Sequence, residues 1–226
     1  MSTYVMRLWL PDRPGALGAV ASRVGAVGGD VVGIDILERG AGRAIDELAV
    51  ELPSDELVPL LLQEVSEVDG VDVEDITPVA EALHDPRLDA LETAAVLVGA
   101  ATAGEAIDAL CHHAVRTVGA EWGAVLELDS GEVLAAQGDV PAAGWLSAFV
   151  AGSREAHQVN GGQSGPEDVV WAPLPGAGMA LVLGRQGAPF RARERRHAAA
   201  LARIVDTRFR ELRMSEARLL HPAVAR

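Results

Sequence analysis

The chain has 226 residues, of which 49% are hydrophobic, and it carries a formal net charge of −14. This length suits one or two domains, and the hydrophobic content is enough for a buried core. The acidic balance disfavours nucleic acid as a partner, because the phosphate backbone would be repelled.

The cysteine content and the N-terminal sequence favour a location in the cytoplasm. Cys111 is the only cysteine, so no disulfide can form within the chain, as expected in a reducing cytoplasm. Met1 leads into a strand pattern with no signal peptide, and the longest apolar runs are too short or too broken to span a bilayer. We therefore expect a cytoplasmic protein with no membrane partner.

The first 80 residues alternate between strand and helix patterns. Strand patterns occupy residues 4–10, 31–39, 43–52 and 71–76. Apolar stripes at helical spacing run through residues 17–27 and 55–68, and Pro59 must lie in the first turn of the second helix. The order βαββαβ predicts a ferredoxin-like split βαβ sandwich, with both helices on one face of the sheet.

The turn between the first strand and the first helix has the sequence Asp12-Arg13-Pro14-Gly15-Ala16-Leu17. Pro14 suits the first helical position, where its missing N–H would have no partner, and Gly15 permits a close approach. The N–H groups of Gly15, Ala16 and Leu17 and the helix dipole together favour a carboxylate, and Asp12 beside them is placed to hold an ammonium group. One small zwitterion satisfies both, so the turn predicts an amino-acid site.

This turn, the apolar helix after it and the stretch Gly28-Gly29-Asp30-Val31 resemble the opening of an ACT domain, a resemblance that covers residues 3–79. ACT domains are small regulatory modules that often bind amino acids. The resemblance implies a ligand held at the turn against a neighbouring subunit's sheet, with Asp30 and Val31 at the head of the second strand opposite it. The ligand-binding residues expected on this basis are Asp12, Pro14, Gly15, Ala16, Leu17, Asp30 and Val31.

Asp30 departs from that family, whose ligand-binding members usually carry asparagine at this position. An ionised aspartate only accepts hydrogen bonds, so Asp30 favours the ligand's ammonium group and repels its carboxylate. The alternative interpretation is that the turn and Asp30 only cap their elements and that no ligand binds.

The rest of the chain begins with a predicted linker at residues 80–87 and ends with a predicted tail at residues 214–226. Helices are predicted at residues 88–98, 103–118, 145–150 and 193–213, the second capped by Thr102 and Glu105. Strands are predicted at residues 122–128, 132–137, 169–173 and 179–184. The polar, glycine-rich residues 152–168 are predicted to form a loop.

Residues 88–213 resemble a GAF domain, a family of small-molecule sensors and dimerisation modules. The resemblance rests on Ala109–Leu128, on Trp171–Leu174, on Leu181–Gly184 and on Pro189-Phe190 before the long last helix. It implies an antiparallel sheet with flanking helices, so the whole chain is expected to be α+β. Because the segment between Gln137 and Val169 is short for a member with a large cofactor, we expect no bilin, haem or cyclic nucleotide and no other cofactor.

Nothing in the sequence indicates catalysis. His112 and His113 are adjacent, and so lack the i, i+4 spacing that puts two metal ligands on one helical face. No nucleophile motif and no phosphate-binding loop occur. The arginine-rich residues 191–218 surround an apolar stripe, which favours the solvated face of an interface helix over an anion site.

These patterns together predict a non-enzymatic regulatory protein. We expect it to bind a small molecule, an amino acid above all, and to act through homodimerisation or by docking to a separate output protein. Open sheet edges and apolar helices favour the homodimer. The alternative is a purely structural pairing module without a ligand.

Overall fold

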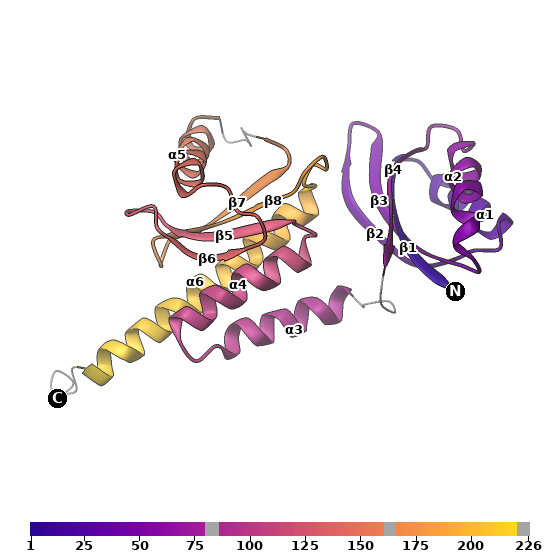
Figure 1. The fold of residues 1–226 in the computed structure, drawn as a ribbon. Helices are drawn as coiled ribbons and strands as arrows, with labels where there is room; N and C mark the ends of the chain where they lie inside the picture. Colours follow the sequence, from indigo (N-terminus) through magenta and orange to yellow (C-terminus); the bar gives the residue numbers. More distant parts are fainter. Residues whose placement is uncertain (80–85, 161–165, 221–226) are drawn as a thin grey trace. The chain divides into compact units, whose positions relative to one another are not determined.

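The computed structural model describes residues 1–79, 86–160 and 166–220. The chain divides into two compact units, Met1–Asp85 with Arg191–Arg193, and Pro86–Phe190 with Glu194–Arg226. Each unit holds one four-stranded antiparallel sheet with helices packed on it (Figure 1), which confirms the predicted α+β class. Every helix in residues 1–79, 86–160 and 166–220 is too short or too polar to span a lipid bilayer.

The sheet of the first unit has the strand order β2-β3-β1-β4. Its strands are β1 (Ser2–Pro11), β2 (Asp30–Gly40), β3 (Arg43–Leu52) and β4 (Asp72–Val79). Helices α1 (Ala16–Ala26) and α2 (Val58–Ser66) both lie on one face of this sheet (Figure 1), and a short 3-10 turn, η1 (Asp55–Leu57), precedes α2. This order and this placement of the helices confirm the predicted ferredoxin-like arrangement.

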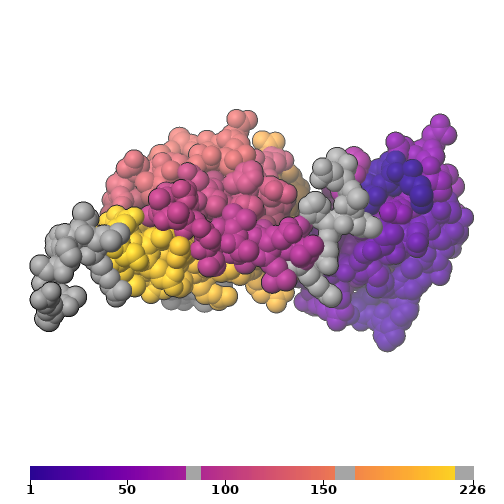
Figure 2. All heavy atoms as spheres, turned by 90° about the horizontal axis from the view of Figure 1, so that it is seen from below, coloured from indigo at the N-terminus to yellow at the C-terminus, as the bar shows by residue number. Residues whose placement is uncertain are grey.

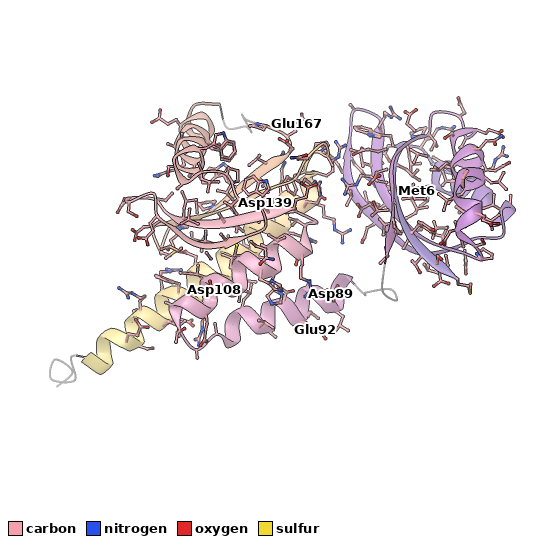
Figure 3. All side chains as sticks on the ribbon, viewed as in Figure 1. Met6, Asp89, Glu92, Asp108, Asp139 and Glu167 are labelled. Carbon is pink, nitrogen blue, oxygen red and sulfur yellow. The ribbon has the colours of Figure 1, made fainter. Side chains whose placement is uncertain are left out.

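Side chains of alternate strand residues build the core of the first unit. Leu48, Val50 and Leu52 of β3 are fully buried, as their alternation with polar residues predicts. Met6 of β1, labelled in Figure 3, is fully buried in the same cluster, which also includes Val20 and Val24 of α1. The sheet therefore has one helix-covered face and one outer face.

The second unit has the strand order β6-β5-β8-β7. Its strands are β5 (Trp122–Glu127), β6 (Val133–Gln137), β7 (Val169–Leu174) and β8 (Met179–Gly184). Its helices are α3 (Pro86–Gly99), α4 (Ala103–Thr117), α5 (Ala143–Asn160) and α6 (Ala192–Leu220). Helices α4 and α6 lie on one face of the sheet with α3 beside α4, and α5 lies on the other face (Figure 1), so this unit has two apolar cores.

The start of α4 follows the predicted cap. The side-chain hydroxyl of Thr102 accepts a hydrogen bond from the Glu105 N–H at 3.2 Å, and the Glu105 carboxylate accepts one from the Ala101 N–H at 2.9 Å. The first bond satisfies a backbone donor that the helix leaves open at its first turn, and the second satisfies the N–H of the residue before the cap.

The bounds of several elements differ from the prediction. Helix α5 runs to Asn160, so the loop predicted from residue 152 was wrong for residues 152–160. Gly152 lies inside this helix with open space where a Cβ atom would be. The burial of Leu146 and Val150 outweighs the low helix propensity of Gly152. Helix α6 continues past the predicted end at residue 213, because no glycine or proline follows before its last residue, Leu220. Helix α3 already begins at Pro86, inside the predicted linker, and residues 80–85 and 161–165 lie outside the described residues.

Candidate functional site

The predicted turn does join β1 to α1, but the helix begins later than expected. Gly15 is the N-cap residue of α1 and has a φ of 90°, a left-handed conformation that a helical residue cannot adopt. The helix therefore starts at Ala16, and the prediction that Pro14 takes the first helical position was wrong. Pro14 instead lies in the turn, before the cap.

The backbone donors of this turn are only partly available to a ligand. The Ala16 N–H donates to the Arg13 carbonyl at 3.3 Å, so it does not join the predicted group of free amides. The N–H groups of Gly15 and Leu17 donate no hydrogen bond within the described part of the chain. Two of the three predicted amides thus remain open at the positive end of the helix dipole.

The register of the sheet separates the predicted acidic residues. Asp12 follows the pair Pro11–Arg43, and its N–H donates to the Gly42 carbonyl at 2.9 Å. Asp30 pairs with Glu51, which in turn pairs with Thr3 at the opposite end of β1. Nine residues of strand separate the two ends, a distance of about 30 Å. A single copy of the chain therefore does not bring Asp30 and Val31 to the turn.

Asp46, the buried acidic residue of β3, is not among the site residues predicted from the sequence. Only 4% of its surface is exposed, and its Oδ1 atom is fully buried without a hydrogen-bond partner among the described residues. The signal was present in the sequence, because Asp46 occupies an apolar position in the alternation that Leu48, Val50 and Leu52 continue. A buried carboxylate oxygen without a partner is costly, and such exceptions call for a ligand, an ion or a strained site as explanation.

The charged neighbours of Asp46 come from the turn and from the edge strand. Burial raises the pKa of Asp46, Arg39 of β2 lowers it, and Asp12 raises it again. Arg39 pairs with Ala44, two residues from Asp46 on the same face of β3. Asp12, Arg39 and Asp46 therefore form a charged cluster at the end of the first unit where α1 begins.

An apolar surface continues from this cluster along β2. Ile36 pairs directly with Asp46 and Ile34 pairs with Leu48, so both isoleucines lie on the helix-covered face of the sheet. They nevertheless remain 39% and 49% exposed. The helices leave this part of the face open, so an exposed apolar strip lies beside the two acids and the one base of the cluster.

The Asp46 carboxylate predicts a pH dependence of stability. Its pKa is raised above the unfolded value of about 3.9, so its contribution to stability is fully present below that pH and is lost as the pH rises through the folded pKa. The amide of the Asp46→Asn variant does not ionise, so the variant does not lose this stability as the pH rises. In urea unfolding we expect the variant to gain stability relative to the wild type as the pH is raised from 4 to 7. A stability difference that does not change with pH would contradict this assignment.

The histidines and the cysteine of α4 form no second site. His112 and His113 contact each other edge to face, and burial, with help from His112 and Arg116, lowers the pKa of His113. No group of three histidine, cysteine or acidic residues able to hold a metal ion occurs in residues 1–79, 86–160 and 166–220.

Cys111 is predicted to be an inert thiol. It is 2% exposed, and burial, with a smaller contribution from Asp108 of the same helix (Figure 3), raises the pKa of Cys111 to about 11. The thiol is therefore protonated at neutral pH, and only the thiolate is reactive. We expect a thiol reagent such as dithionitrobenzoate to label the protein only after denaturation. Rapid stoichiometric labelling of the folded protein would show that the thiol is accessible.

Comparisons with known proteins give only distant structural similarities. No family model matches the sequence, and no curated protein matches it. Among solved structures it is similar to a bacteriophytochrome from the photosynthetic bacterium R. palustris, with 14% identity and a TM-score of 0.45 over 84% of this chain; the match spans 44% of that chain.

Two further solved structures show the same degree of similarity. The GAF domain of a protein from Pseudomonas syringae pv. tomato matches with 15% identity and a TM-score of 0.39, over 60% of this chain and 92% of that one. The chromophore-binding domain of an R. palustris bacteriophytochrome matches with 11% identity and a TM-score of 0.42, over 94% of both chains. At this level of similarity the matches do not assign the chain to a family.

Proposed function

We propose that this chain is a non-enzymatic regulatory protein of the cytoplasm whose first unit binds an amino acid. The observation that supports this most is the N-terminus of α1, where Gly15 and Leu17 offer amides that bind nothing else in the described residues. A helix N-terminus of this kind favours a carboxylate. The acids of the same end, Asp12 and Asp46, supply the negative charge that an ammonium group needs.

Ligand binding would change either how the second unit docks to a partner protein or how two copies of the chain pair. The first unit carries the proposed ligand site. Asp30 and Val31 are far from the turn before α1 in their own copy, so they would contribute to the site only at the turn of a second copy. A ligand that binds one arrangement of the copies better than another shifts the population toward it. A separate output protein would respond to that shift by binding one of the two arrangements.

A thermal-shift screen tests the proposal. We expect at least one of the standard amino acids to raise the unfolding temperature of the full chain, because a ligand at about 100 times its Kd adds about 2.7 kcal/mol of stability. Ammonium acetate at matched ionic strength is the control and should have no such effect. If no amino acid produces a shift that the salt does not, the proposal fails.

The second candidate is a pairing module without a ligand, which the solvent face of α3 favours. Exposed apolar residues of this helix follow one another at spacings of three, four and three residues, whereas Leu97 of the same helix is buried: they are Leu88, Leu91, Ala95 and Val98. Leu91 is 70% exposed, and residues of α3 lie at the surface that Figure 2 shows. This spacing is typical of a helix-pairing seam.

Light scattering of the wild type and two variants tests the pairing. We expect the wild type to have the mass of a dimer at micromolar concentration and Leu91→Gln to shift the protein to the monomer, because the seam loses its most exposed side chain. Leu134→Gln, at a 37% exposed position of β6, is the matched control and should leave the mass unchanged. A monomeric wild type would exclude the pairing module.

A further inference from the structure

The buried Asp46 carboxylate is the strongest unexplained feature of the molecule. It belongs to the row of β3 side chains that face the helices, between Ala44 and Leu48. Its Oδ1 atom accepts no hydrogen bond in the described residues. A carboxylate that served only the fold would accept hydrogen bonds or pair with a cation, because a buried unsatisfied acceptor destabilises the folded state.

Positively charged, acidic and apolar groups follow one another along the strands around Asp46. Toward the α1 end lie Arg39, opposite Ala44, and then the turn with the open amides of Gly15 and Leu17. Beside Asp46 and away from that end lie Ile36 and Ile34. Neighbouring rows on this face are about 7 Å apart, so a positive region, a negative carboxylate and an apolar strip follow one another within about 15 Å.

We propose that the Asp46 carboxylate binds the ammonium group of an aliphatic α-amino acid, whose carboxylate is held by Arg39 and the α1 N-terminus and whose side chain lies over Ile34 and Ile36. The inference rests on the proposed amino-acid binding and replaces Asp12 and Asp30 as the ammonium ligand. The raised pKa of Asp46 agrees with it, because a cation beside the carboxylate would relieve the cost of ionisation.

The apolar strip narrows the ligand class. Ile34 and Ile36 expose side chains on a face that is otherwise core, and an aliphatic ligand side chain would remove that apolar surface from water. A charged ligand side chain would instead lose hydration there. Leucine, isoleucine and valine are therefore the probes of choice.

Calorimetry of the full chain with L-leucine, L-isoleucine and L-valine tests the inference. We expect saturable binding to the wild type, and weakening by roughly ten- to a hundred-fold in Asp46→Asn, since a charge-assisted hydrogen bond is lost while the shape is kept. Arg39→Gln changes an exposed residue and should weaken binding by a similar factor without affecting the fold. Asp75→Asn, at an exposed position of β4 on the other edge of the sheet, is the matched control and should change the affinity less than threefold.

A ligand-side comparison separates loss of the ammonium contact from loss of the fold. The deaminated analogue 4-methylpentanoate lacks the ammonium group, so it should bind the wild type weakly and bind Asp46→Asn at least as well. The unliganded Asp46→Asn protein should unfold at or above the wild-type temperature at pH 7.

The outcomes distinguish this inference from the proposed function. An amino acid that binds the wild type and Asp46→Asn equally would overturn the role of Asp46 and leave amino-acid binding standing. Binding of polar or charged amino acids alone would overturn the role of Ile34 and Ile36. Failure of every amino acid to bind the wild type would overturn both the inference and the proposed function.

Discussion

Replacement of Arg185 by alanine is expected to lower the free energy of unfolding of the second unit by about 3–5 kcal/mol. Arg185 directly follows β8 and makes two 2.9 Å hydrogen bonds to the Glu194 carboxylate, with 7% and 10% of the two side chains exposed. Removing the guanidinium leaves the buried Glu194 charge without this partner, which is the reason for the large effect.

The same side chain also satisfies backbone carbonyls from two other segments. It donates to the Val118 carbonyl after α4 at 3.0 Å, and to the carbonyls of Ala188 and Pro189 at 2.9 and 2.8 Å. Arg213→Ala is the matched control, because its 3.6 Å ion pair with Glu216 is exposed and should contribute less than about 1 kcal/mol. Urea unfolding followed by tryptophan fluorescence measures both variants, and equal midpoints would refute the assigned role of Arg185.

Gly138→Ala should destabilise the second unit to a similar extent. Gly138 follows β6 with a φ of 74°, and a Cβ atom there would lie 2.2 Å from the Glu121 carbonyl oxygen. The left-handed conformation costs a non-glycine residue about 1–2 kcal/mol. Overpacking against backbone that cannot rotate away adds about 1–3 kcal/mol. The sum predicts a loss of about 2–5 kcal/mol.

Gly152→Ala is the opposite case in the same unit and serves as its control. Gly152 lies inside α5 with no atom within 4 Å of an added Cβ. Alanine should therefore raise stability by about 0.5–1 kcal/mol through its higher helix propensity. If Gly138→Ala unfolded at the wild-type urea concentration, the close approach of β6 to Glu121 would be wrong.

The fold was largely predictable because it follows from local patterns. Alternation in β3 and helical spacing in α1 each depend on neighbouring residues, so the order of elements in the first unit could be derived from the sequence alone. The length of α5 could not, because Gly152 has the local signal of a loop and only the packing of Leu146 and Val150 on the sheet shows that it is helical.

The candidate site was less predictable, because it depends on register. Asp12 and Asp30 both flank α1 in sequence, but the strands place them at opposite ends of the sheet. Asp46 is a polar residue at an apolar position of the alternation, which the sequence shows. The lack of a hydrogen-bond partner for its Oδ1 atom depends on the folded structure and could not be predicted. The left-handed Gly15 similarly moves the start of α1 and removes the Ala16 amide from the site.

Calorimetric titration of the purified wild-type chain with each standard amino acid decides whether the chain binds one. We expect saturable heat for at least one amino acid, with one ligand per chain, and none for the corresponding amide, which lacks the carboxylate that the α1 N-terminus would bind. If no amino acid gives saturable heat at millimolar concentration, the chain is not an amino-acid sensor, and a pairing module would be the better description.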